Sequence, residues 1–215
     1  MTAGEALRVY VMEVGPLMVN AYIVEEPAAK KAVVVDPGDD GDAILRQIRD
    51  RELSVEKILL THGHFDHVGA VRLLREKTGA PVHVHAEDAK RMATARRQGL
   101  MFGLSVDDPP PPDVTVGEGD RIAFEGREFA VVHTPGHTPG CVSYLCGGMA
   151  FVGDLLFAGS IGRTDLPGGS YEQLIASVRE KIFVLPDDTI VFPGHGPSTT
   201  VGREKRSNPF FTGDI

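Results

Sequence analysis

Three imidazoles and one carboxylate lie within six residues of the chain, at His62, His64, Asp66 and His67. They directly follow an apolar run, 57–61, that predicts a buried strand. Alternate side chains at a strand end point the same way, so His62 and His64 can converge on one ion, while Asp66 and His67 can serve a second. Imidazole and carboxylate suit zinc, iron or manganese. The spacing therefore predicts a metal site rather than a polar turn in which Asp66 caps a helix.

Three further ligand-type residues, His137, Asp154 and His195, lie in glycine-rich segments that each follow a predicted strand. Glycine allows close backbone approach and positive φ angles, which a ligand on a sharp loop needs. A lone histidine in such a turn is usually structural. Several similar loops that each deliver a ligand-type residue reverse that expectation and favour a shared site.

The remaining candidates are weaker. His83 and His85 alternate within a predicted strand and His133 ends another, so we interpret them as core residues or as supports for a ligand. Asp36 ends an apolar strand at Asp-Pro-Gly. It is either an ordinary turn former or a carboxylate that holds a ligand histidine, and the sequence leaves both interpretations open.

Composition limits the partners. The chain has 215 residues and a formal net charge of −8. An acidic surface repels phosphate backbones and anionic lipid, which disfavours nucleic-acid and membrane partners. No apolar run reaches about 18 residues, and the first residues show no export signal. The only cysteines are Cys141 and Cys146. We therefore expect a cytoplasmic protein with reduced thiols, which take no part in the chemistry.

Periodicity predicts an α/β protein. Strands are expected at 8–14, 21–25, 32–36, 57–61, 82–85, 121–124, 128–133, 142–145, 149–152 and 189–192. Helices are expected from about Asp42, at 68–78, at 87–98 and at 171–183. Ser170 and Gln173 form a capping-box signature before the last helix. Strands outnumber helices, which favours two sheets packed face to face with helices outside.

The aperiodic stretch 99–113 carries four consecutive prolines, Pro109 to Pro112. It could link two domains, because such a run is stiff and extended. We prefer a long surface loop within a single domain, 1–215, because neither half alone carries a complete site.

At these residues the chain resembles the metallo-β-lactamase superfamily, and within it the short glyoxalase II-type (hydroxyacylglutathione hydrolase-like) enzymes that lack a C-terminal helical domain. The likeness extends over nearly the whole chain. Besides the ligand loops it includes Gly15-Pro16-Leu17 with Asn20, the segment 159–165, and Asn208-Pro209-Phe210. The resemblance implies the αββα sandwich. It also implies that His62, His64 and His137 bind one metal, that Asp66, His67 and His195 bind a second, and that Asp154 bridges both.

The implied activity is metal-dependent hydrolysis of a thioester, most simply S-D-lactoylglutathione or another hydroxyacylglutathione. Two divalent ions, with zinc expected and iron or manganese as alternatives, would hold a bridging hydroxide that attacks the carbonyl. A thiolate departs with little protonation, which suits a site without a general acid beyond the ligands. Asp66 and Asp154 are the catalytic carboxylates. Arg163 is expected to support the site or meet the substrate without binding metal.

Two other functions are kept open. Persulfide dioxygenases share this fold and would use His62, His137 and Asp154 to hold one non-haem iron. A non-catalytic binding module is disfavoured by seven intact ligands.

The basic residues Arg203, Lys205 and Arg206 either meet an anionic thiol carrier or form a solvated helix face. The substrate is a small-molecule thioester, and the oligomeric state stays open between a monomer and a homo-oligomer.

Overall fold

The computed structural model describes residues 6–213, which form two compact units. Unit 1 consists of residues 6–84 and 89–115, and unit 2 of residues 85–88 and 116–213. Each unit contains one six-stranded sheet. No helix of the described residues is both long and apolar enough to cross a membrane.

The sheet of unit 1 has the strand order β1-β2-β3-β4-β5-β6, antiparallel from β1 to β3 and parallel from β3 to β5. Its strands are β1 (Arg8–Val14), β2 (Val19–Glu26), β3 (Lys31–Val35), β4 (Ser54–Leu59), β5 (Val82–His85) and β6 (Val114–Val116). The helices of this part of the chain are α1 (Gly41–Asp50), α2 (Phe65–Val68), α3 (Val71–Thr78), α4 (Ala86–Met92) and α5 (Ala95–Met101).

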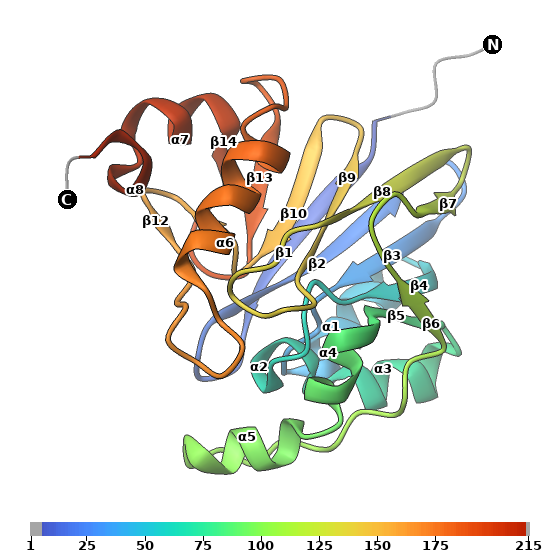
Figure 1. The fold of residues 1–215 in the computed structure, drawn as a ribbon. Coiled ribbons are helices and arrows are strands. Elements are labelled where there is room, and N and C mark those ends of the chain that lie inside the picture. The colour runs from blue at the N-terminus through green and yellow to red at the C-terminus, as the bar shows by residue number, and fades with distance from the viewer. Residues whose placement is uncertain (1–5, 214–215) are drawn as a thin grey trace. The chain divides into compact units, whose positions relative to one another are not determined.

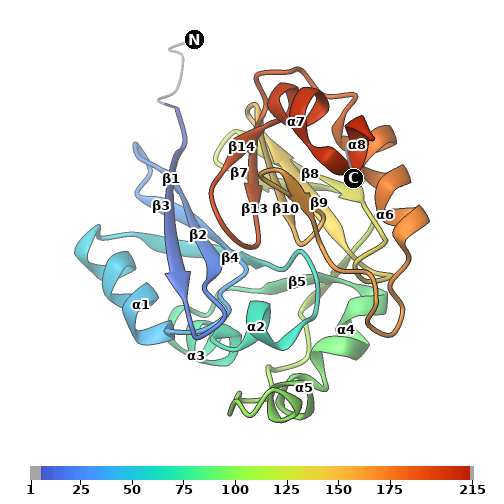
Figure 2. The same ribbon diagram turned by 90° about the vertical axis from the view of Figure 1, so that its left-hand side faces the viewer.

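Helices cover one face of this sheet because their apolar residues recur at helical spacing. Figure 2 shows α1 and α3 on the same face of this sheet. Ile44, Leu45 and Ile48 of α1 are buried in one cluster with Val34 of the strands, and α3 adds Leu74. Because β3 and β4 run parallel, their carboxyl ends lie at the same edge of the sheet. The loops that follow them carry the predicted ligands of unit 1.

The sheet of unit 2 has the order β14-β13-β10-β9-β8-β7, and a separate hairpin pairs β11 with β12. Its strands are β7 (Arg121–Phe124), β8 (Arg127–His133), β9 (Val142–Cys146), β10 (Met149–Gly153), β11 (Leu156–Phe157), β12 (Ser160–Ile161), β13 (Ile190–Pro193) and β14 (Thr199–Thr200). Its helices are α6 (Tyr171–Ser177), the π-helical turn η1 (Val178–Ile182), α7 (Val201–Ser207) and α8 (Pro209–Thr212).

The helices of unit 2 also pack on one face of their sheet (Figure 1). Leu174, Val178 and Ile182 lie on one side of α6 and η1 and are buried with Val152 and Val191 of the strands. The predicted capping box is confirmed, because the Ser170 side chain accepts a hydrogen bond from the Gln173 amide at 3.3 Å. The helix predicted at 171–183 is present, although its second half is π-helical.

Two predicted helices are each split into two. The helix expected at 68–78 breaks at Gly69, where the Ala70 amide donates to the Pro37 carbonyl instead of continuing the helical pattern. A Cβ on Gly69 would lie 2.3 Å from the Gly38 oxygen, so close backbone approach causes the break. The helix expected at 87–98 breaks before Thr94, whose hydroxyl donates to the Arg91 carbonyl and closes a turn.

The sequence patterns missed the short strands β6, β11, β12 and β14, because two or three residues show no usable period. The coil after α5 belongs to unit 1, whose boundary follows it at Thr115. That one domain spans 1–215 stays a prediction. The predicted α/β class, with two main sheets each flanked by helices, is confirmed.

Candidate metal centre

The four predicted ligands of unit 1 lie together at the end of β4 and the start of α2. The ring centroid of His62 is 4.9 Å from that of His64 and 4.1 Å from that of His67. The Asp66 Oδ2 atom lies 3.9 Å from His67 Nε2. Three imidazoles and one carboxylate are thus gathered within one short segment, as its spacing predicted.

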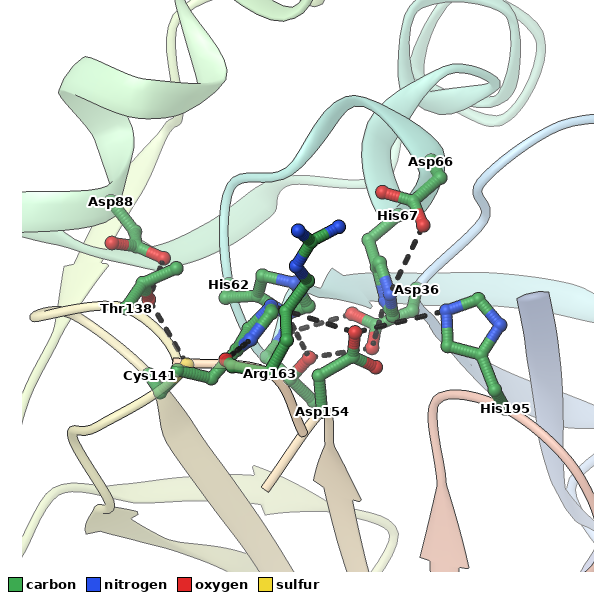
Figure 3. Close-up of polar contacts among 12 residues, drawn as sticks. Asp36, His62, Asp66, His67, Asp88, Thr138, Cys141, Asp154, Arg163 and His195 are labelled. Atoms are coloured by element: carbon green, nitrogen blue, oxygen red, sulfur yellow. Dashed lines mark hydrogen bonds and ion pairs between the residues drawn. The ribbon is translucent and has the colours of Figure 1, made fainter. Parts of the chain in front are cut away.

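A chain of hydrogen bonds fixes the orientation of two of these rings. The Thr61 hydroxyl donates to Asp36 Oδ2 at 2.6 Å, so its oxygen accepts from His62 Nδ1 at 3.1 Å. His67 Nδ1 donates to the same Asp36 oxygen at 3.1 Å (Figure 3). An imidazole that carries its proton on Nδ1 has its lone pair on Nε2. Both rings therefore present Nε2 as the atom that could bind a metal.

Asp36 fulfils both interpretations that its sequence context left open. It adopts a left-handed backbone, with φ of 48°, at the turn after β3. Its side chain is buried and also accepts from the Thr61 amide at 2.8 Å. The carboxylate consequently joins the ends of β3 and β4 and holds His67, a predicted ligand.

The three predicted ligands of unit 2 come from separate loops but meet at one carboxylate. His137 Nε2 lies 3.5 Å and His195 Nε2 3.7 Å from Asp154 Oδ2. Both distances exceed those of a normal hydrogen bond. Two ligand atoms each about 2.1 Å from a tetrahedral ion lie roughly 3.4 Å apart, so this spacing fits ligation better than direct contact.

The ring of His137 is oriented by the main chain. Its Nδ1 lies 2.7 Å from the Arg163 carbonyl oxygen and must donate to it, because a carbonyl only accepts. Its Nε2 is therefore the atom that could bind a metal, as for His62 and His67. The Arg163 guanidinium binds the Asp165 carboxylate through two hydrogen bonds and lowers the pKa of Asp165 to about 2. It is Arg163's backbone, rather than its side chain, that contacts a predicted ligand.

Glycine is required where two of these loops pack closely. Gly136, with φ of 142°, precedes His137, and a Cβ there would lie 2.3 Å from the Leu174 Cα atom. A Cβ on Gly162 would lie 1.8 Å from the Asp154 carbonyl oxygen. The glycine-rich composition that marked these loops thus has a steric cause.

Both sets of donors fit the metals expected from the sequence. Unit 1 offers imidazole nitrogens and the Asp66 carboxylate, and unit 2 offers two imidazoles on one carboxylate. Neither set includes a thiolate. Such mixed nitrogen and oxygen donors suit zinc, iron or manganese alike.

The other histidines have structural surroundings. His83 is buried, which lowers its pKa, and its Nδ1 lies 3.3 Å from the Pro81 carbonyl. The rings of His85 and His133 stack with centroids 4.7 Å apart, and His133 Nε2 contacts the Pro139 carbonyl at 2.9 Å. These contacts agree with the expectation that the three residues lie in the core or support a ligand loop.

The sequence reasoning missed Asp88, which is buried within unit 2. It accepts from the Thr138 hydroxyl at 2.6 Å (Figure 3). It also accepts from the Gly140 amide at 3.2 Å. The carboxylate thereby anchors the loop that carries His137. An acidic residue in the first turn of a helix usually faces solvent, so the sequence contained no signal of this role.

Both cysteines are free and buried. The Cys141 Sγ atom lies 3.0 Å from the Thr138 hydroxyl, and burial raises the pKa of this thiol well above its usual range. Burial also raises the pKa of Cys146. A protonated thiol is a weak nucleophile and a weak ligand, which agrees with the expectation that neither cysteine takes part in the chemistry.

Comparison with known proteins identifies the family. The family model described as "Metallo-beta-lactamase superfamily" matches residues 14–195. The chain belongs to this superfamily. Within it, the chain is 42% identical over 185 residues to a Haemophilus influenzae protein named hydroxyacylglutathione hydrolase GloC, covering 84% of this chain and 87% of that protein. It is 39% identical over 206 residues to the Bacillus subtilis probable metallo-hydrolase YqgX, covering 94% and 96% of the two chains.

Solved structures of the superfamily match the fold. BLEG-1, titled a B3 metallo-β-lactamase, has a TM-score of 0.90 at 39% identity, covering 95% of this chain and all of that one. TTHA1623 in a di-iron-bound form has a TM-score of 0.87 at 42% identity, covering 94% and 100%. ETHE1 from Myxococcus xanthus has a TM-score of 0.80 at 31% identity, covering 96% and 85%. The fold and the broad prediction of a metallohydrolase of this superfamily are confirmed.

Proposed function

We propose that this metallohydrolase cleaves a thioester, S-D-lactoylglutathione or another hydroxyacylglutathione, with two bound divalent metal ions. The proposed ligands are His62, His64, Asp66 and His67, which lie in unit 1, and His137, Asp154 and His195, which lie in unit 2. The relative named hydroxyacylglutathione hydrolase, at 42% identity, supports the substrate class. Zinc is the proposed metal and iron the alternative, since a similar structure is titled as di-iron-bound.

The hydrogen bond from His67 to Asp36 carries the two-metal part of the proposal. A dioxygenase of this fold with one iron would use His62, His137 and Asp154 and would leave His67 without a role. The buried Asp36 carboxylate nevertheless fixes the Nδ1 proton of His67 and presents its Nε2 as a donor. Such a support is expected for a ligand to a second metal.

The reaction consumes one water. Bound metal ions would lower the pKa of that water towards neutrality and polarise the carbonyl. The water oxygen forms a bond to the carbonyl carbon, the carbon–sulfur bond breaks, and the products are a carboxylic acid and a thiol. Asp154, which His137 and His195 both approach, would share a metal ion with these ligands. A thiolate leaves without a strong proton donor, so the ligand residues suffice.

The structure favours a solvated role for the basic residues near the C-terminus. Lys205 lies 2.7 Å and Arg206 3.6 Å from carboxylate oxygens of Asp187. We therefore assign neither residue to the thiol carrier. The two free thiols support the proposed cytoplasmic location, and the proposed partner is the small-molecule thioester alone.

Persulfide dioxygenation is the second candidate, supported by the similarity to ETHE1. The experiment that separates the two compares Asp66→Ala and His195→Ala with the unmodified protein. Each variant is expected to bind about one metal fewer and to lose at least about a hundredfold in hydrolysis of S-D-lactoylglutathione. Metal content and oxygen uptake with glutathione persulfide are measured on the same samples. The dioxygenase assignment would replace the hydrolase assignment under one outcome. The unmodified protein would lack thioesterase activity and show persulfide-dependent oxygen uptake, and both variants would retain that uptake.

A further inference from the structure

A cavity of about 120 Å³ lies in unit 1 beside the proposed metal ligand Asp66. We infer that this cavity binds the acyl chain of the thioester and selects an apolar chain of about five carbons beyond the carbonyl. The inference rests on the proposed function, because the cavity can receive an acyl chain only if a thioester is hydrolysed at the metal that Asp66 would bind.

The lining of the cavity is mostly apolar. It is formed by the end of β1 and the turn after it, the loop after β3, the start of α2, and the coil that follows α5. The apolar side chains are those of Val14, Pro16, Leu17, Phe65, Leu104 and Val106. Val14 and Phe65 are buried, whereas Leu17 is 39% exposed. This distribution gives the cavity an apolar floor and a rim open to solvent.

Several contacts hold the walls in place. The Gly15 amide donates to Asp40 Oδ2 at 2.9 Å and ties the turn after β1 to the loop after β3. The Leu104 amide donates to the Gly99 carbonyl at 2.9 Å, which fixes the coil after α5. The rings of Phe65 and Phe102 pack with centroids 5.2 Å apart. The cavity is consequently preformed, as expected of a small-molecule site.

Charge decides which end of the substrate the cavity takes. Asp39 and Asp66 lie in the lining, which contains no Lys, Arg or His. Glutathione has a net charge of −1 at neutral pH, from two carboxylates and one ammonium, and its carboxylates would find no cationic side chain in this lining. An uncharged acyl chain has no such penalty and buries apolar surface against Leu17 and Leu104.

Size sets the preferred length. An apolar cavity of about 150 Å³ holds benzene, which has six carbons, so by volume alone the 120 Å³ of this cavity accommodates about five. Each buried methylene raises affinity about fourfold. Hydrolysis should therefore improve from acetyl to butyryl by about 15-fold in kcat/KM, improve again at hexanoyl, and gain nothing further at decanoyl.

The test measures kcat/KM of the metal-loaded protein for S-acetyl-, butyryl-, hexanoyl- and decanoylglutathione. Leu104→Trp fills the cavity and should remove the advantage of hexanoyl over acetyl in kcat/KM. Leu17→Ala, at a more exposed position, should reduce the same advantage about threefold without risk to folding. Leu100→Trp and Met101→Ala are matched controls, because both residues are exposed on α5 and outside the lining.

Binding is measured separately with two ketone analogues that cannot be hydrolysed, S-(2-oxopropyl)glutathione and S-(2-oxopentyl)glutathione. Calorimetry should show the longer analogue binding about 15-fold more tightly, and Leu104→Trp should abolish this difference. If Leu104→Trp and its control Leu100→Trp show the same chain-length preference, the acyl site is overturned but the proposed thioesterase function is not. Absence of hydrolysis of every thioester, including S-D-lactoylglutathione, would overturn the proposed function and this inference with it.

Discussion

The two units present their proposed ligands in different ways. In unit 1 the ligands are nearly consecutive, and side chains orient them, with Asp36 and Thr61 fixing His62 and His67. In unit 2 each ligand comes from a separate loop. There His137 is oriented by a backbone carbonyl, and Gly136 allows its loop to approach α6.

The difference shows where each arrangement is vulnerable. A ligand held by a side chain depends on the chemistry of that side chain, so a substitution that barely changes its shape should weaken metal binding. A ligand held by the main chain depends on the path of the backbone, so it should tolerate side-chain changes and respond to a lost glycine.

Gly136→Ala should have the largest effect on stability. The new Cβ would lie 2.3 Å from the Leu174 backbone, and we expect a loss of about 3 kcal/mol in the free energy of unfolding. Urea unfolding of metal-free protein measures it. Gly79→Ala is the matched control, because it also has positive φ but nothing lies within 4 Å of its Cβ, so it should lose only about 1 kcal/mol. Equal losses would contradict the steric account.

Asp36→Asn should weaken metal binding about ten- to a hundredfold with little change in shape. Asparagine tolerates the positive φ of this position, but its neutral amide accepts the His67 proton more weakly and cannot accept all three present donors. Competition with a chelator of known affinity measures the change. Asp42→Asn, at an exposed position of α1, is the control. Unchanged affinity in Asp36→Asn would mean that His67 does not bind metal.

Arg163→Ala should leave metal affinity within about threefold of the unmodified value, because the carbonyl that holds His137 remains. The same chelator competition compares it directly with Asp36→Asn. A tenfold or larger loss would show that the pair between Arg163 and Asp165 controls the loop path, and the distinction between the two units would then be weaker.

The smallest effect is expected at the thiols. The double change Cys141→Ser and Cys146→Ser should keep kcat within about tenfold, because burial raises both thiol pKa values and disfavours the reactive thiolate. Steady-state kinetics at unchanged metal content test this. In the folded protein, a disulfide reagent should also label neither thiol at pH 8, and rapid labelling would show that the loop bearing Cys141 opens.

The sequence by itself determined the α/β class, the family and the full set of candidate ligands. The cluster from His62 to His67 could be predicted because local spacing alone brings its side chains together. The glycines around His137 and Asp154 indicated loops that need close backbone approach. The periodic elements were predicted for the same reason, since the burial of one face repeats at a fixed interval.

Only the tertiary structure decided how the ligands are held. The pairing of β3 with β4 brings Asp36 next to Thr61, 25 residues away, and no local pattern encodes that contact. Three other features likewise arise from segments distant in sequence. They are the contact of Asp88 with the loop of His137, the hydrogen bond between His137 and the Arg163 carbonyl, and the cavity beside Asp66. Spacing along the chain reports which side chains are available, whereas hydrogen-bond partners depend on which strands become neighbours.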